Sequence, residues 1–195
     1  NKEEMNVKIK MTLLSDTIFG NGVSIPGGED ISVLTDENGF PYYKGSSFKG
    51  VFREEAENLL CWIGEGETAE NFLDEVLGKS DHNYLTHQEK KKIRCSNFTL
   101  SNAVQQRVKQ QVGQDKDRIL RSFSYLRTFT AMRDNGMTKK GSLREGRCLK
   151  KGLIFYGTIE CEKEQEQFVE QVLSCIKWIG TMRTRGFGKI KLERI

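Results

Sequence analysis

The chain has 195 residues, of which 36% are hydrophobic and 30% charged, so it can bury the core of one domain beneath a highly charged surface. It contains no apolar run near the ~18 residues that a membrane-spanning helix requires, and its five cysteines include no CxxC pair of the kind that holds zinc. With no secretory leader in the sequence, these features predict a protein of the reducing cytoplasm, with free thiols and no membrane partner.

Charge is distributed unevenly, although the net charge of +4 is only mildly basic. Residues 54–75 carry eight acidic side chains and no basic one. In contrast, residues 127–151 carry eight basic and two acidic side chains, and residues 177–195 carry six basic side chains and one acidic one. A basic face opposed to an acidic one can steer a polyanion, but such runs can equally be solvated surface.

The first half of the chain predicts a strand and a helix joined by a long loop. Apolar and polar residues alternate from Met5 to Leu13, which is typical of a half-buried strand. The loop that follows contains a possible short strand at 31–34. Apolar positions then recur at intervals of three and four up to Ile63 and predict a helix. We expect Ser46 or Ser47 to cap its start and Gly64 or Gly66 to end it.

The middle of the chain has weaker patterns. Short helices are expected around Asn71–Leu77 and His87–Ile93, followed by an extended segment at 94–100. Residues 113–152 are polar, basic and interrupted by glycines, and within them Ser124–Met132 and Ser142–Leu149 are predicted to pair as a projecting hairpin.

The end of the chain predicts a strand at 153–161, a helix at Glu164–Ile179 ended by Gly180, and a strand at Lys189–Ile195. The resulting order is strand, helix, weak strand, strand, helix, strand. This is the ferredoxin-like α+β plan, with helices on one face of an antiparallel sheet. We therefore predict one domain over 1–195, with a core of about 1–64 and 152–195 and an insertion at about 65–151.

Two segments combine glycines with basic side chains. In the segment from Lys44 to Arg53, a helix start carries Gly45, Ser46, Ser47, Lys49 and Arg53, whose N–H groups, hydroxyls and charges suit a phosphate. In the segment 180–189, Gly186 and Gly188 would let the backbone approach a phosphate, with Arg183 and Arg185 supplying charge. An ordinary serine-capped helix and a tight turn are the alternatives for the two segments.

Two further segments carry possible chemistry. Asp30 ends a Gly-Gly-Glu-Asp loop, where a carboxylate could reach a phosphate or a hydrated Mg²⁺ ion, or could simply be a turn residue. The basic stretch mixes charges that could hold an RNA backbone with apolar tips that could wedge between bases, unless it is a solvated loop. Its residues are Arg127, Phe129, Met132, Arg133, Met137, Lys139, Lys140, Leu143, Arg144, Arg147, Lys150 and Lys151.

Together, GGEDISVLTDENGFPYYKGSSFKGVFR at 27–53 and GTMRTRGFGKI at 180–190 resemble the RAMP superfamily. The resemblance is to the backbone subunit that polymerises along guide RNA in type III CRISPR complexes. It spans both ends of the chain, whereas residues 65–125 match loosely. Lys44 is a departure, because family members often carry proline there.

The resemblance implies a modified RNA-recognition-motif core with an inserted, thumb-like hairpin that kinks the guide RNA. It implies guide contacts from Lys44, Gly45, Ser46, Ser47, Lys49 and Arg53, from Arg127, Met132 and Arg133, and from Arg183, Arg185, Gly186 and Gly188. It also implies that Asp30 supports cutting of complementary target RNA, with Mg²⁺ or another divalent ion aiding attack by the 2′-hydroxyl. The expected partners are guide RNA, target RNA, further copies of the chain and other CRISPR effector subunits.

Several alternatives remain at this point. The chain could be a scaffold without nuclease activity, in a complex where another protein cuts. It could be a guide-processing endoribonuclease that uses His82 or His87 as a general acid or base. It could be a protein-binding module of ferredoxin-like fold. A zinc site could be assembled only from His82, His87, Cys61 and Cys95, whose spacing contains no close ligand pair.

Overall fold

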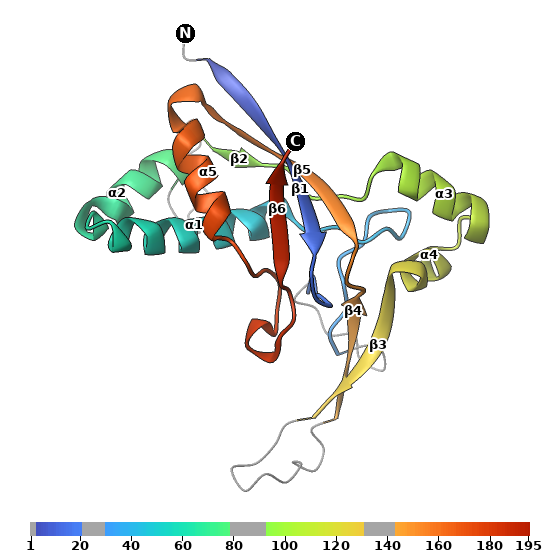
Figure 1. Ribbon diagram of the computed structural model, residues 1–195. Coiled ribbons are helices and arrows are strands. Elements are labelled where there is room, and N and C mark those ends of the chain that lie inside the picture. Colours follow the sequence, from blue (N-terminus) through green and yellow to red (C-terminus); the bar gives the residue numbers. More distant parts are fainter. Residues whose placement is uncertain (1–2, 21–29, 79–92, 131–142) are drawn as a thin grey trace, which may run out of the picture.

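The computed structural model describes residues 3–20, 30–78, 93–130 and 143–195 (Figure 1). The core elements in chain order are β1 (Glu4–Leu13), α1 (Gly45–Trp62), β2 (Arg94–Cys95), β5 (Ile154–Glu162), α5 (Glu166–Cys175) and β6 (Ile190–Arg194). The inserted elements are α2 (Gly66–Leu77), α3 (Asn102–Val112), α4 (Lys116–Phe123), β3 (Ser124–Phe129) and β4 (Arg144–Leu149). Two short 3₁₀ turns, η1 (Lys163–Gln165) and η2 (Arg183–Arg185), flank α5.

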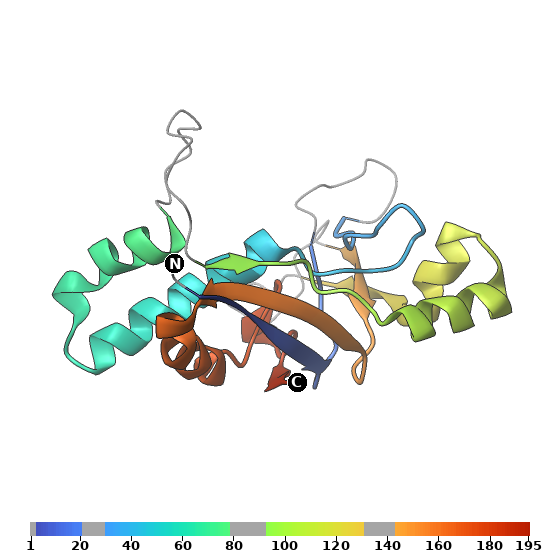
Figure 2. The same cartoon turned by 90° about the horizontal axis from the view of Figure 1, so that it is seen from above.

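The core is the predicted ferredoxin-like sheet with helices on one face. Its strand order is β2-β5-β1-β6, with antiparallel pairing throughout. Val7 pairs with Ile159 and Met11 with Phe155, so apolar side chains that alternate along both strands fall on the same face. That face is buried together with one face of α1 and of α5, and the sequence prediction of α+β class is confirmed (Figure 2).

The start of α1 differs from the expected serine cap. The helix begins at Gly45, and Lys44 stands at the N-cap without a side-chain hydrogen bond. Gly45 donates its backbone N–H to Asn97 Oδ1 at 2.8 Å, and a Cβ at this position would lie 2.3 Å from the carbonyl oxygen of Cys95. A tertiary contact with the segment after β2 therefore sets this helix boundary, and the end at Ile63–Gly64 is as expected.

The insertion forms two separate parts on either side of the core. The helix α2 packs against α1, whereas α3 and α4 lie at the other side of the molecule (Figures 1 and 2). The α4 helix is anchored by Phe123, whose ring centroid lies 6.0 Å from that of Phe40. The expected hairpin is confirmed as β3 and β4, and it projects away from the core sheet in Figure 1.

Other boundaries depart from the sequence predictions. Residues 31–34 form only isolated bridges, from Ile31 to Gly146 and from Val33 to Gly20. The α5 helix ends at Cys175 rather than at Ile179, and α3 and α4 were not predicted. All five cysteines are free, with Cys148 and Cys161 buried and Cys175 half-buried. No helix in the described parts of the chain is long and apolar enough to cross a membrane.

Candidate nucleic-acid interface

Three segments that are distant in sequence meet beside the core, below the sheet in Figure 1. They are the glycine loop (residues 180–188), the β3–β4 hairpin, and the segment Asp30–Ile31. A small apolar cluster joins them, and it is separate from the main core. Its buried members are Ile18, Phe129, Cys148 and Phe187, with Ile31 and Met182 packed against them.

The glycine loop has a tightly determined backbone. Gly188 has φ +83° and lies so close to Ile179 that an added Cβ would stand 1.9 Å from its carbonyl oxygen. Met182 adopts a left-handed conformation with φ 58°, which is uncommon for a residue with a side chain. The loop is therefore held in one shape, with its 3₁₀ turn exposed to solvent.

The two arginines of this loop differ in their contacts. Arg183 makes an ion pair with Glu54 of α1, with a nitrogen–oxygen distance of 3.3 Å. Arg185 is exposed and makes no ion pair or hydrogen bond through its side chain within the described residues. Its charge is therefore available to a ligand.

The glycine loop also lies beside the start of α1. Tyr43, just before the helix, is 5% exposed. Burial raises the pKa of its hydroxyl, opposed by a hydrogen bond with the backbone of Gly180 and by the charge of Arg183. The two glycine-containing segments singled out in the sequence are thus brought together.

In the segment from Lys44 to Arg53, the serines are free of hydrogen bonds to described residues, whereas the basic side chains of Lys49 and Arg53 are engaged. Ser46 and Ser47 are exposed, and their N–H groups donate to nothing in the described structure. Lys49 donates to the carbonyl oxygen of Leu77. Arg53 makes an ion pair with Asp74 at 3.1 Å and donates to the carbonyl of Gly78. These two cations therefore hold the C-terminus of α2, which is where a helix favours positive charge.

Asp30 is attached to β4 near the outer end of the hairpin, one residue from the Phe129–Arg144 pair. Its Oδ2 accepts a hydrogen bond from the backbone N–H of Glu145 at 2.8 Å. The next residue, Ile31, pairs with β4 by donating to the carbonyl of Glu145 at 3.2 Å and accepting from Arg147 N–H at 2.9 Å. A Cβ on Gly146 would approach the Phe129 ring to 2.9 Å, so glycine there allows this close pairing.

The Oδ1 atom of Asp30 accepts no hydrogen bond from the described residues, and the side chain is exposed. Across the described residues, no group of three or more His, Cys, Asp or Glu side chains is placed to hold a metal ion. A single carboxylate still suits Mg²⁺, because this ion keeps several waters and commonly binds one or two carboxylates together with substrate phosphates.

Some predicted site residues cannot be compared with the structure. Met132 and Arg133, with Lys139 and Lys140 of the basic stretch, lie outside the described residues, as do His82 and His87. The described part of the stretch places Arg127 over the ring of Phe187, with 5.1 Å between the guanidinium carbon and the ring centroid.

Sequence reasoning did not select Phe187, Tyr125 or Asp16, which lie at this junction. Phe187 lies within the glycine loop, and only its apolar character between two glycines hinted at a packing role. Tyr125 donates to Asp16 Oδ2 at 2.6 Å. That contact joins residues 109 positions apart, so no local pattern could have revealed it.

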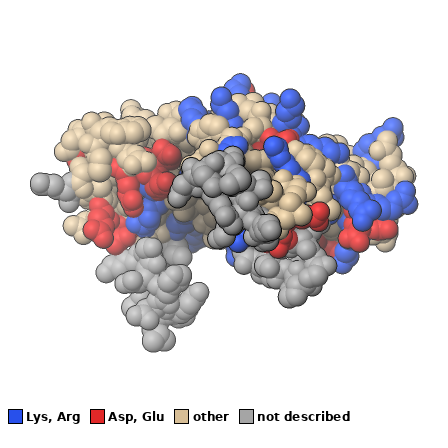
Figure 3. Space-filling model, turned by 90° about the horizontal axis from the view of Figure 1, so that it is seen from below, with Lys and Arg blue, Asp and Glu red and all other residues tan. Residues whose placement is uncertain are grey.

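The surface charge follows the unevenness of the sequence. Seen from below, acidic side chains gather toward the end of the molecule where α1 and α2 lie, and basic ones predominate toward the opposite end (Figure 3). The described acidic residues of the α1–α2 end are Glu54, Glu55, Glu57, Glu65, Glu70, Asp74 and Glu75. Polarity of this kind orients the molecule in the field of a charged partner.

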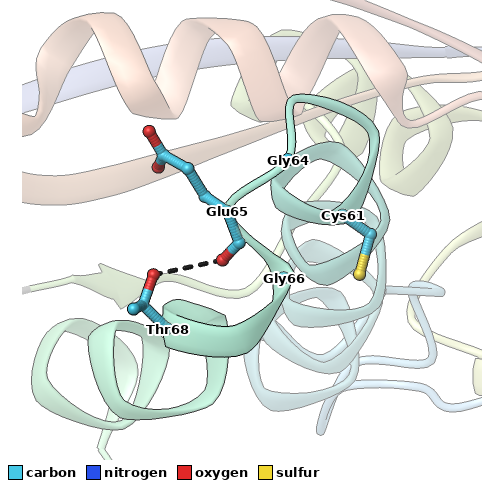
Figure 4. Close-up of a pocket in the computed structure, with 5 residues that line it drawn as sticks. All are labelled: Cys61, Gly64, Glu65, Gly66 and Thr68. Carbon is cyan, nitrogen blue, oxygen red and sulfur yellow. Dashed lines mark hydrogen bonds between the residues drawn. The ribbon is translucent and has the colours of Figure 1, made fainter.

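The turn between α1 and α2 exposes apolar surface within this acidic region. Trp62 is 73% exposed and Ile63 is 59% exposed. A shallow pocket of about 520 Å³ adjoins them (Figure 4). It is lined by Cys61, Gly64, Glu65, Gly66 and Thr68. Thr68 Oγ1 donates to the carbonyl of Glu65 at 3.1 Å and closes the turn. None of the residues that line the pocket belongs to the glycine loop.

Comparison with known structures gives close agreement in fold at low sequence identity. The cryo-EM structure of the Type III-B Cmr-beta bound to cognate target RNA contains a chain with TM-score 0.70 and 12% identity, and the match covers 97% of each chain. The apo state of Type III-B Cmr-beta contains one with TM-score 0.66 and 13% identity, covering 98% of this chain and 97% of that one. At such identities the likeness establishes the fold.

No curated protein sequence matches the chain. The family model of the RAMP superfamily matches residues 10–191, which is nearly the whole chain and includes both glycine-containing segments. The chain therefore belongs to the RAMP superfamily.

Proposed function

We propose that this protein is a subunit of a type III CRISPR effector complex and that it binds guide RNA along the RNA backbone. The observation that carries the proposal is the junction of the glycine loop, the hairpin and the α1 start, where exposed cations and free N–H groups converge. Similarity to chains in Cmr-beta complexes, one of them bound to target RNA, supports it. Contacts to backbone phosphates carry no sequence information, so binding should tolerate any guide sequence.

The proposal is tested by RNA binding across a salt series. Arg185→Gln removes an exposed charge without breaking a described contact, so it should weaken binding and reduce the salt dependence. A Lys49→Glu/Arg53→Glu variant is less informative, because the same change releases α2 from α1. If the wild-type protein does not bind RNA, or if its affinity does not change with salt, the proposed function is ruled out.

We further propose that Asp30 supports cleavage of bound target RNA. In the expected reaction, the 2′-hydroxyl attacks the adjacent phosphorus, the bond to the 5′-oxygen breaks, and a 2′,3′-cyclic phosphate is left on the upstream fragment. Asp30, fixed by the N–H of Glu145, would present its free Oδ1 at the phosphate or at an ion bound there. A divalent ion such as Mg²⁺ would stabilise the developing negative charge.

Two Asp30 variants separate this role from a structural one. Asp30→Asn keeps an oxygen that can accept from Glu145 N–H but loses the charge, whereas Asp30→Ala loses both. Cleavage by the assembled complex should be lost in both variants if the carboxylate acts on the phosphate. Cleavage retained in Asp30→Asn but lost in Asp30→Ala would make Asp30 an anchor of the hairpin. Cleavage retained in both would favour a scaffold whose partner cuts.

The proposal includes contact between copies of the chain along the guide. The acidic, apolar α1–α2 turn of one copy faces solvent, and the opposite end of the molecule is basic. A head-to-tail arrangement would bring these two surfaces together, and a repeated contact of this type generates an open filament.

A further inference from the structure

The guanidinium of Arg127 is held in place on a fixed aromatic ring. It lies over Phe187, and the ring of Phe187 is only 5% exposed. Phe187 meets Phe129 edge to face at 5.7 Å between centroids, so it is fixed between the glycine loop and the hairpin. A cation above a buried ring is attracted to the π face and loses rotational freedom before any ligand arrives.

A second contact orients the same side chain. The hydroxyl of Tyr125 donates to Asp16 Oδ2 at 2.6 Å and lies close enough to Arg127 to interact with its guanidinium. The pKa of Tyr125 is raised mainly by its hydrogen bond to Asp16, while the interaction with Arg127 opposes that effect. The phenol therefore stays neutral and links the carboxylate to the guanidinium.

Asp16 is itself immobilised by the surrounding backbone. Its Oδ1 accepts from the N–H of Lys151 at 3.0 Å, and its carbonyl oxygen accepts from Gly188 N–H at 3.0 Å. Both carboxylate oxygens of Asp16 are thus engaged by donors, and Tyr125 stands between this charge and Arg127. The network joins the hairpin, the glycine loop and the segment after β1.

The arrangement leaves most of the Arg127 fork available. A guanidinium carries five N–H donors, and within the described residues the contacts of Arg127 are the face of Phe187 and the neighbouring hydroxyl of Tyr125, with no ion pair. An exposed planar fork that is already oriented matches an anionic group with two adjacent oxygens, which is the geometry of a phosphodiester. Because its rotamer is fixed beforehand, little side-chain entropy is lost on binding.

We infer that Arg127, positioned by Phe187 and Tyr125, binds one phosphodiester group of single-stranded RNA where the hairpin meets the glycine loop. This inference rests on the proposed function, since it assumes that the chain binds RNA. It adds a defined site and assigns Tyr125 and Phe187 as positioning residues rather than direct contacts.

The test measures dissociation constants for a labelled oligouridylate across a salt series. Arg127→Gln should weaken binding about tenfold, in line with the loss of a charged hydrogen bond. It should also make the slope of log K against log salt shallower by about 0.7, as for the loss of one phosphate contact to a single strand. Arg107→Gln is the matched control, because Arg107 is exposed on α3 and makes no side-chain contact in the described structure.

Two further variants test the positioning. Tyr125→Phe removes only the hydroxyl and should weaken binding severalfold in wild type but add nothing in an Arg127→Gln background. Arg127→Lys keeps the charge but should bind less tightly than wild type, because lysine lacks the planar fork. Thermal unfolding of each variant checks that the fold is retained.

The outcomes separate the two proposals. If wild type binds RNA but Arg127→Gln behaves like Arg107→Gln, the inference is wrong while the proposed function stands. If the effects of Tyr125→Phe and Arg127→Gln on affinity are fully additive, Tyr125 does not orient Arg127. If Arg127→Lys binds as tightly as wild type, the planar fork of Arg127 is not needed. If wild type does not bind RNA at all, the proposed function fails, and the inference fails with it.

Discussion

Two glycines of the glycine loop provide a matched pair at the scale of single residues. Gly186 and Gly188 have nearly equal φ values of +84° and +83°. A Cβ on Gly186 meets nothing within 4 Å, whereas one on Gly188 would collide with the carbonyl of Ile179. Gly186→Ala should cost about 1–2 kcal/mol of unfolding free energy from the left-handed backbone alone. Gly188→Ala should cost clearly more, because the backbone must also shift.

Urea unfolding of the two variants measures this difference directly. The same pair also reports on the role of the loop in RNA binding. Gly186→Ala leaves the fold of the loop in place, so any loss of RNA affinity there reflects the approach of a phosphate to the backbone. Equal loss of stability in the two variants would show that the contact between Gly188 and Ile179 does not constrain the loop.

Cys95 should make stability depend on pH in the alkaline range. Burial raises the pKa of this thiol to about 12, with the charge of Lys49 opposing the shift. Above its ordinary pKa near 9, the thiol ionises in the unfolded chain but stays protonated in the folded protein. The unfolding free energy therefore falls as pH rises from about 9 to about 12. Below pH 9 the contribution of the Cys95 thiol to stability is complete.

A comparison with Cys95→Ala isolates this effect from other groups that titrate at high pH. Between pH 8 and pH 10, wild type should lose about 1 kcal/mol more than the variant, as measured by urea unfolding at each pH. Identical pH dependence of the two proteins would mean that the thiol is solvated in the native state.

At the scale of elements, Arg53 and Lys49 attach α2 to α1. The side chain of Arg53 is 19% exposed and bonds Asp74 and the carbonyl of Gly78, the C-cap of α2. Arg53→Gln should lower the unfolding free energy by about 1.5–3 kcal/mol, the range for hydrogen bonds to charged groups. Lys44→Gln, which removes an exposed cation at the N-cap of α1, should have little effect. Hydrogen exchange of the α2 amides would show whether this helix loosens first.

The core elements could be predicted because their burial repeats locally. The alternation in β1 and β5 and the helical spacing in α1 each follow from one buried face. The α3 helix has no fully buried residue, so its sequence carries little helical periodicity. The prediction that a serine caps α1 is wrong, because the side chain of Asn97, which is distant in sequence, accepts the hydrogen bond from Gly45 N–H and the helix begins there.

The candidate site likewise has a part that could be predicted from the sequence and a part that could not. Its glycines and arginines were visible as local motifs. What the motifs could not show is that Lys49 and Arg53 contact α2, or that Asp30 bonds β4 across 115 residues. These contacts depend on the path of the insertion, where the hydrophobic periodicity is weak.

At the scale of the whole molecule, charge polarity and exposed apolar surface coincide. The α1–α2 turn presents Trp62 and Ile63 in acidic surroundings, and the opposite end is basic (Figure 3). Exposed tryptophans are frequent hot spots of protein interfaces, and complementary charge at the rim speeds and orients association. Contact between copies should therefore weaken as salt is raised.

Replacing Trp62 tests this surface without altering the RNA junction. Trp62→Ala should weaken self-association by about 30-fold or more, the effect of losing a hot-spot tryptophan, as followed by sedimentation with and without RNA. Trp178→Ala is the control, because Trp178 is also exposed, at 37%, but lies beside Lys189 at the glycine loop. RNA binding by a single copy should persist in Trp62→Ala, because Trp62 is remote from the loop. If both variants assemble like wild type, copies meet through another surface. If only Trp178→Ala fails to assemble, the contact between copies lies at the glycine loop, and the acidic turn is left for a different subunit.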